Sequence, residues 1–398
     1  MSSSGSATSM SFLGNLTGCG AGMCCALLLH SRISGMIKRL EVKAFRGLSG
    51  LVLDDLARVN ILVGGNGVGK TSVLESIALI LGANNPTLIG ALSGWREFPV
   101  LQLVDDEGLR SLFPSMDLDH ALQINIANTG DGKLQTLKIE AIQNTQTYLR
   151  AANGAIRGLD LPEQFATGDT KTLLGASYTY TSATGNSRAA HLLLQPGGVV
   201  PIVPKPFNAP SSFYIYARRA TSNREIADMV TRMISSKQRD TLMEALRVLD
   251  ARVKDVLIKP VSGGQALVLL DVGLPHYIPM NALGDGFCRT ALILTGLLSR
   301  SGTVLVDEID SGLHPSSMQL FWANIRTLAE KFPFQLFCTT HNEEMLENTL
   351  SAFASSPDAL RIYRIQHAPD GGTAATKFDY ALYQDSDAAG FDIRGSNG

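Results

Sequence analysis

Three short stretches of the chain contain residues that could carry phosphate chemistry. The first, GGNGVGKTS, fits the pattern G-x-x-x-x-G-K-[ST]. Glycines in such a loop let successive backbone N–H groups turn toward phosphate oxygens, and a helix that begins there adds the positive end of its dipole. The lysine would reach the β- and γ-phosphates, and the threonine hydroxyl would bind Mg²⁺. The expected phosphate-binding residues are Gly64, Gly65, Asn66, Gly67, Val68, Gly69, Lys70, Thr71 and Ser72.

The second stretch is TVLVDEID, in which four apolar residues lead into Asp307 and Glu308. A buried strand that ends in acidic residues delivers them to the carboxyl edge of a sheet, beside the phosphates of a bound nucleotide. We expect Asp307 to hold Mg²⁺ together with Thr71, and Glu308 to orient or deprotonate the attacking water. Together with the glycine loop, this pair predicts ATP hydrolysis rather than a merely solvated strand end.

The third stretch is FCTTH, which ends at His341. It follows the acidic pair by one helix and one strand, so its histidine would reach the same edge of the sheet. A lone histidine is more often structural, but this placement favours an imidazole that contacts the γ-phosphate. The catalytic candidates are therefore Glu308, His341 and Lys70.

The elements that must position these residues follow from apolar spacing. VNILV predicts a strand before the glycine loop, and TSVLESIALILGA has the apolar spacing of a helix after it. Beyond Phe287, CRTALILTGLLSR and SSMQLFWANIRTLAEKF predict helices, while GTVLVDE and FQLFCTTH predict strands. Strands that alternate with helices indicate an α/β fold with a parallel sheet.

The middle of the chain has a different pattern. From about residue 85 to 210 several short strands predict a mostly antiparallel lobe, and VVPIVPKPFNAP, with four prolines, predicts a linker. The following segment, up to Asp250, predicts a helix broken near Ser235. We expect an ATPase core in residues 36–85 and 275–398, with 86–274 as an inserted β-rich lobe and helical segment.

Composition excludes several classes of protein. The 398 residues are 45% hydrophobic and 18% charged, so the chain can fill a sizeable core and is not disordered overall. A net charge of -2 gives no overall nucleic-acid footprint. No uncharged apolar run approaches the roughly 20 residues of a membrane helix. The five cysteines have neither metal-ligand spacing nor an even count, so a reducing cytoplasm is expected.

Residues 1–35 differ from the rest because they are rich in Ser and Gly and uncharged until His30. AGMCCALLL is similar to the core of a signal peptide, but no positive charge precedes it. We expect a disordered extension, or an upstream start codon with translation beginning at Met36.

Five motifs together resemble a known family. Phe45-Arg46, the glycine loop, Asp307-Glu308, SGLHP and TTH look like those of the ABC-type ATPases of the SMC, RecF and OLD-like group. DEIDSGLHP followed by FCTTHNEEML is especially similar to OLD-like ATPases of bacterial genome-maintenance and phage-defence systems. The resemblance covers 36–85 and 275–398 well and the middle loosely. It implies an ABC-type core in a P-loop NTPase fold, with two Mg-ATP held in a homodimer.

The resemblance also implies a signature loop at the start of the helix before the Asp307 strand. VSGGQ begins at Val261, 46 residues before Asp307, and leads into a strand-like segment. LGDGF begins at Leu283, 24 residues before Asp307, and a helix follows it. We therefore interpret SGG as a hairpin turn and expect the partner subunit's nucleotide to meet Gly284, Asp285 and Gly286.

The chain departs from the family pattern in three places. Gly284 replaces the usual serine of the signature, and His314 stands where transporter-type enzymes carry an aspartate. The nearest candidate for a Q-loop residue is Gln102, for which a plain strand position is the stronger interpretation. The first departure removes a hydroxyl contact to phosphate.

Candidate contacts with other molecules are weaker. Arg218, Arg219 and Arg224 could meet nucleic-acid phosphates or the nucleotide, but a solvated helix is the favoured interpretation. Tyr178 and Tyr180 could stack on bases, although packing within the sheet is favoured.

Two functions fit these residues. The first is an ATPase that drives a DNA-maintenance or phage-defence effector; the alternative is a nucleotide-gated sensor or scaffold with negligible turnover. Only 57 residues follow His341, and they contain no recognisable nuclease. We expect a nuclease or other effector, if one is used, to be a separate protein, with DNA as a possible ligand and no membrane contact.

Overall fold

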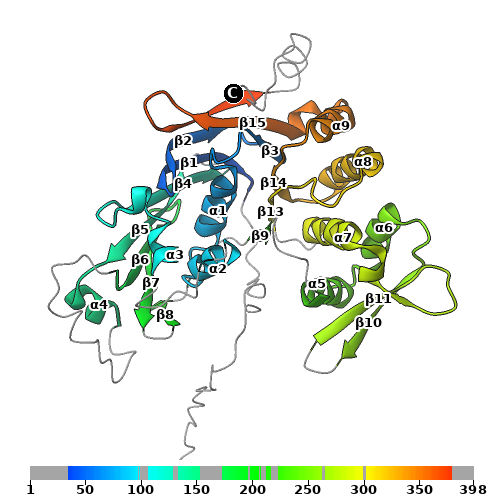
Figure 1. Ribbon diagram of the computed structural model, residues 1–398, viewed down its shortest axis with the longest axis horizontal. Coiled ribbons are helices and arrows are strands. Elements are labelled where there is room, and N and C mark those ends of the chain that lie inside the picture. The colour runs from blue at the N-terminus through cyan, green and yellow to red at the C-terminus, as the bar shows by residue number, and fades with distance from the viewer. Residues whose placement is uncertain are drawn as a thin grey trace, which may run out of the picture.

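The computed structural model describes residues 35–96, 98, 106–128, 133–152, 173–195, 198–205, 207, 212–216, 223–261, 265–298 and 302–378. These residues form a core sheet, a large antiparallel sheet and a small three-stranded sheet, with helices packed on and between them (Figure 1). Among the described helices, none is both long and apolar enough to cross a membrane.

The core sheet confirms the parallel arrangement predicted from the alternating strands and helices. Its strand order is β16-β15-β3-β14-β13-β9, and all neighbours pair in parallel except β15 and β16. Every residue of β3, β13 and β14 is buried, as a sheet covered on both faces requires. The strands are β3 (Val59–Val63), β9 (Ser212–Ile215), β13 (Thr303–Val306), β14 (Gln335–Thr339), β15 (Leu360–His367) and β16 (Thr373–Phe378).

Helices cover the two faces of this sheet. α1 (Lys70–Leu81) and α2 (Leu88–Trp95) lie on one face, between the core sheet and the antiparallel sheet (Figure 1). The other face carries α7 (Asp285–Leu298), α8 (Pro315–Lys331) and α9 (Glu343–Phe353). Side chains of β13 alternate accordingly: Leu305 belongs to the hydrophobic cluster around α1, and its neighbours Val304 and Val306 belong to the cluster around α7.

The second sheet is the predicted antiparallel lobe, in the order β2-β1-β4-β5-β6-β7-β8. Its first two strands precede the glycine loop, so residues assigned to the ATPase core by the proposed domain boundaries also build the lobe. Conversely, β9 lies within 86–274 but completes the core sheet. The strands are β1 (Ile37–Phe45), β2 (Leu48–Asp54), β4 (Leu122–Asn128), β5 (Leu134–Ile142), β6 (Gly175–Thr181), β7 (Ser187–Gln195) and β8 (Gly198–Ile202), with α3 (Glu107–Arg110) and α4 (Thr145–Ala152) beside them.

The prediction that VVPIVPKPFNAP is entirely a linker is wrong for its first part. Residues 198–202 form the edge strand β8, in which Pro201 stands opposite Leu192 of β7. Proline lacks a backbone N–H, and an edge strand tolerates it because one side of the strand needs no partner.

The helical segment of the middle region breaks where predicted. α5 (Asn223–Ser235) and α6 (Arg239–Leu249) are separated by a turn in which Lys237 has a φ of 59°. A small sheet follows, in the order β10-β11-β12. Its strands are β10 (Asp255–Val261), β11 (Gln265–Asp271) and β12 (Ile278–Pro279), and a 3₁₀ turn, Met280–Leu283, leads into α7.

One buried amide joins the two large sheets. Gln335, at the start of β14, is 2% exposed. Its Oε1 accepts a hydrogen bond from Ile37 N at 2.9 Å, and its Nε2 donates to Ile37 O and Ala57 O, both at 2.8 Å. The side chain therefore binds the backbone of Ile37, at the start of β1, and of Ala57, and it fixes the start of the lobe against the core sheet.

We predict that Gln335→Ala lowers the free energy of unfolding by about 3 kcal/mol, because it removes the side-chain partner of the Ile37 N–H and carbonyl and one of the two amide donors to Ala57 O. Urea denaturation would measure the loss. The matched control is Asn324→Ala, which removes an amide that donates to Leu320 O at a solvent-exposed position. This control should change stability by less than about 0.5 kcal/mol. Equal effects of the two substitutions would contradict the proposed joint.

Candidate active site

The glycine loop connects β3 to α1 and can adopt its path only with glycine at particular positions. Gly64 has a φ of +138°, and a Cβ there would collide with the carbonyl oxygen of Ile365. Gly69 has a φ of +102°, and a Cβ there would lie 2.6 Å from Cδ2 of Leu48. Both conformations are disfavoured for other residues. The loop is thus held close to β15 and β2, with Asn66 and Gly67 exposed at its tip.

Lys70 is the first residue of α1 and is almost fully buried, with 6% exposure. Its Nζ donates hydrogen bonds to Gly64 O at 2.8 Å and Gly65 O at 2.7 Å, so the ammonium group lies under the loop. Burial lowers the pKa of Lys70 from its ordinary 10.5 to about 8, although the charges of Asp307 and Glu308 act to raise it. Desolvation of the ammonium group therefore outweighs the attraction of the two acidic groups.

Thr71, at the start of α1, and Asp307, directly after β13, are in contact, as predicted from the two motifs. Oγ1 of Thr71 lies 3.1 Å from each carboxylate oxygen of Asp307, and Oγ1 of Thr339 donates to Oδ1 of Asp307 at 2.7 Å. Mg²⁺ in nucleotide sites is usually bound by one or two protein oxygens, with phosphate oxygens and waters as the other ligands. A hydroxyl and a carboxylate this close together fit such an ion.

Glu308 and His341 follow β13 and β14 at the same carboxyl edge. Glu308 is exposed and has a φ of 49°, a left-handed conformation that non-glycine residues rarely adopt. Its N–H donates to Oγ1 of Thr339 at 2.8 Å. Burial lowers the pKa of His341, and the positive charge of Lys70 lowers it further, so the imidazole is neutral near pH 7. A neutral imidazole can still donate one hydrogen bond to a phosphate oxygen.

The structure separates the two candidate signature loops. Val261 pairs with Gln265 in the antiparallel hairpin of β10 and β11, so VSGGQ lies at a hairpin and not before a helix; residues 262–264 themselves fall outside the described residues. By contrast, Gly284 and Asp285 are exposed at the start of α7. α7 and α1, the helix that follows the glycine loop, cover opposite faces of the core sheet (Figure 1).

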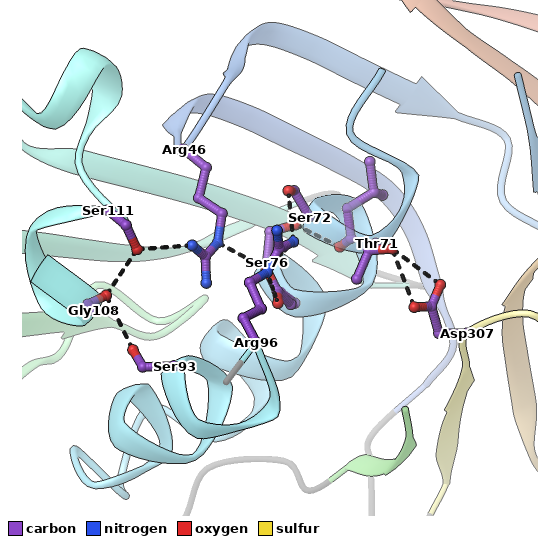
Figure 2. A network of polar contacts seen from close by, with 11 residues as sticks. Arg46, Thr71, Ser72, Ser76, Ser93, Arg96, Gly108, Ser111 and Asp307 are labelled. Atoms are coloured by element: carbon purple, nitrogen blue, oxygen red, sulfur yellow. Dashed lines mark hydrogen bonds and ion pairs between the residues drawn. The ribbon is translucent and has the colours of Figure 1, made fainter. Parts of the chain in front are cut away.

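A charged network beside the glycine loop was not predicted. Glu75, fully buried in α1, accepts hydrogen bonds from Nε of Arg46 and Nε of Arg96, both at 2.8 Å. Arg46 also donates to Ser111 Oγ at 3.0 Å, and Arg96 donates to Ser72 Oγ at 3.3 Å. Figure 2 shows both arginines approaching α1 beside Ser72, while Thr71 faces Asp307 on the other side of the helix. The signal in the sequence was a lone glutamate in an apolar helix, which requires a buried partner.

The structure describes only some of the remaining candidate residues. Gln102, Arg218 and Arg219 lie outside the described residues. Arg224 is exposed, with Nε 4.0 Å from a carboxylate oxygen of Asp228, which is the ordinary i,i+4 pair of a solvated helix.

The two tyrosines considered for base stacking pack within the protein. The hydroxyl of Tyr178 donates to Pro86 O at 3.0 Å, and that of Tyr180 donates to Gln135 Oε1 at 2.7 Å. Tyr180 also stacks on Phe207 with ring centroids 5.5 Å apart. The packing interpretation is therefore confirmed for both.

Comparisons with known proteins agree with the chemistry of this site. The family described as "AAA domain, putative AbiEii toxin, Type IV TA system" matches residues 204–347. An "ATP/GTP phosphatase" of Helicobacter pylori is 21% identical over 342 residues, which cover 78% of this chain and 87% of that protein. The "DNA replication and repair protein RecF" of Heliobacterium modesticaldum is 49% identical over 49 residues, covering 12% of this chain and 13% of that protein.

Solved structures give looser matches. A structure of the SmcHead bound to the C-winged helix domain of ScpA aligns with a TM-score of 0.45 and 12% identity, covering 88% of this chain and 99% of that one. The SMC head domain from Thermotoga maritima aligns with a TM-score of 0.38 and 12% identity, covering 86% and 98%. At these scores no residue role is transferred. The glycine loop, the mixed α/β core and the match of residues 204–347 to an AAA domain family make this chain similar to P-loop ATPases.

Proposed function

We propose that the chain binds Mg-ATP and hydrolyses it in a homodimer that sandwiches two nucleotides. The observation that carries this proposal is the meeting of Thr71 and Asp307, from motifs 236 residues apart, beside the buried ammonium group of Lys70. A hydroxyl, a carboxylate and a cation at the end of a glycine loop are the groups that Mg-bound phosphates require.

Each residue has a distinct role in this proposal. The glycine-loop amides and Lys70 bind the phosphates, and Thr71 and Asp307 hold Mg²⁺, which would withdraw charge from the phosphate oxygens. Glu308, exposed at the same edge, accepts a proton from the attacking water or orients it. His341 donates a hydrogen bond to the γ-phosphate and reports its presence.

The dimer is proposed because α7 lies on the face of the core sheet opposite α1, the helix that follows the glycine loop. Gly284 and Asp285 are exposed, and Gly284 has a φ of +96°. The amides at the start of a 14-residue helix suit an anion. A second subunit that brings its glycine loop to Gly284, Asp285 and Gly286 would complete both sites.

We propose that hydrolysis drives an effector of DNA maintenance or phage defence. The similarity to a DNA replication and repair protein and the toxin-related family description support this role. The effector, a nuclease or another protein, would bind the ATPase as a separate chain. A nucleotide-gated sensor with negligible turnover is the second candidate, because Gly284 offers the partner's phosphate no hydroxyl.

We predict that Glu308→Gln lowers phosphate release by at least about 100-fold while leaving ATP bound, because the amide cannot take a proton from water. The variant should accumulate as an ATP-dependent dimer, measured by light scattering with Mg-ATP and with Mg-ADP. Lys70→Ala is the companion variant and should neither bind ATP nor dimerise. Both assays should be run with and without double-stranded DNA.

Each result has a distinct meaning. Wild-type turnover that both substitutions abolish supports the ATPase, and stimulation by DNA supports a role in nucleic-acid transactions. ATP-dependent dimers without wild-type turnover would replace the motor with the sensor. Hydrolysis by a protein that stays monomeric at every nucleotide state would exclude the sandwich dimer.

We predict that affinity for ATP falls as pH rises through about 8, because the phosphates bind the charged form of Lys70, whose pKa is about 8. The expected limit is tenfold weaker binding per pH unit. Free protein should show the opposite trend in stability. Between about 8 and 10.5 the unfolded chain binds the extra proton, so the contribution of Lys70 to the unfolding free energy rises with pH.

Equilibrium titration with ATP from about pH 7 to about pH 9.5 would measure the dependence on Lys70. Lys70→Arg is the matched control, since a guanidinium stays charged throughout that range. Its affinity can differ from the wild type, but the decrease above pH 8 should disappear. The same slope in both proteins would show that another group titrates.

A further inference from the structure

Arg289, on the first turns of α7, is held by backbone carbonyls of the catalytic segment. It is 7% exposed, and its Nη2 donates to Asp307 O at 2.6 Å and to Glu308 O at 3.1 Å. Its Nη1 donates to Tyr216 O, just beyond β9, at 3.3 Å. A single guanidinium therefore joins α7 to the carboxyl ends of two neighbouring strands of the core sheet.

This arginine is costly to bury, and within the part of the chain that the structure describes its hydrogen bonds go to backbone carbonyls, not to a carboxylate. Burial lowers the pKa of its guanidinium, although the negative charges of Asp307, Glu308 and Asp310 act to raise it. Its Nε is buried and has no hydrogen-bond partner among the described residues. An apolar side chain would often stabilise such a position as well or better. The guanidinium is better explained by the geometry that it imposes on the two carbonyls.

A second contact joins α7 to the same segment. A Cβ on Gly286 would overlap the carbonyl oxygen of Gly312, and a Cβ on Gly312 would lie 3.0 Å from Cα of Gly286. The first turn of α7 thus touches the loop after β13 backbone to backbone. Together with Arg289, this contact fixes the exposed loop Gly284–Gly286 to the segment 307–312 at two points.

Glu308 lies inside that fixed segment and has the left-handed φ of 49°. A residue in this conformation persists only where its surroundings determine it. Its N–H donates to Oγ1 of Thr339, and its carbonyl accepts from Nη2 of Arg289 at 3.1 Å and from the N–H of Ser311 at 3.0 Å. A displacement of α7 would therefore remove one of the two donors to the Glu308 carbonyl, the one that comes from outside the segment itself.

We propose that Arg289 is a positioning residue that couples the start of α7 to Glu308 of the same subunit. The inference rests on the proposed dimer, in which Gly284, Asp285 and Gly286 meet the partner's nucleotide. When that loop engages the partner's phosphate, α7 is held in place and Arg289 holds the Asp307 and Glu308 carbonyls. Each subunit thereby senses the nucleotide of the other site before it hydrolyses its own.

The test compares Arg289→Met and Arg289→Lys with the wild type in the full chain. The readouts are the ATP dissociation constant, kcat, the Hill coefficient of hydrolysis, ATP-dependent dimerisation and the thermal midpoint. The control is Thr295→Val, which removes a buried hydroxyl of the same helix that donates to Ala291 O and Leu292 O. This control separates a loss of helix stability from a loss of coupling.

We expect Arg289→Met to bind ATP and dimerise as the wild type does, while kcat falls on the order of 100-fold, as for a misplaced catalytic group. The Hill coefficient should fall to about 1, the value for independent sites. Arg289→Lys keeps the charge but not the planar fork, so its kcat should fall by at least about tenfold. Thr295→Val should keep both kcat and the Hill coefficient.

Two results would overturn the inference while leaving the ATPase intact. One is a wild-type kcat in Arg289→Met. The other is a parallel loss of binding and hydrolysis that follows the thermal midpoint, which would show a merely structural role. If Arg289→Met does not fold, a wild-type kcat in Arg289→Lys overturns it equally. A wild type that binds ATP as a dimer and never hydrolyses it would overturn the proposed hydrolysis and the inference together.

Discussion

The hydroxyl of Thr339 lies at the carboxyl edge of the core sheet, where β3, β14 and β13 end. The positions of the Asp307 carboxylate and the Glu308 backbone depend on it. It donates to Oδ1 of Asp307 and accepts from the N–H of Glu308. It can do so because β14 lies between β3 and β13, all three running in parallel. The carboxyl ends of parallel strands meet at one edge of a sheet, so residues 31 and 32 positions apart in the chain become neighbours.

Buried polar groups carry the connections between parts of the molecule. Gln335 binds backbone atoms of the lobe to the core sheet, Glu75 binds two arginines beside the glycine loop, and Arg289 joins α7 to Asp307 and Glu308. An apolar contact could supply comparable stability, but it is not directional. A hydrogen bond in a buried setting penalises displacement strongly, since a lost partner is not replaced by water. The connections that bear on the site are the directional ones.

VSGGQ and LGDGF resemble the same signature motif but lie in different structural contexts. VSGGQ is closer in sequence to the signature, but it follows one strand and leads into another, and its first and last residues pair across a hairpin. LGDGF has the poorer likeness, yet it opens α7 and so presents backbone amides at a helix start. The spacing and the alternation of apolar residues were enough to predict the hairpin at VSGGQ and the helix after LGDGF, because both are local properties of the chain.

The sequence by itself determined the glycine loop, the acidic pair, the alternation of strands and helices, and the break between α5 and α6, because each depends on neighbouring residues and their periodicity. Only the tertiary structure decided that β1 and β2 join the antiparallel sheet, that β9 completes the core sheet, and that β8 is a strand despite its proline. It also decided the partners of Glu75 and Arg289. These features depend on pairings between residues far apart in the chain. A charged residue in an apolar segment predicts that a partner is present, but it does not predict which residue the partner is.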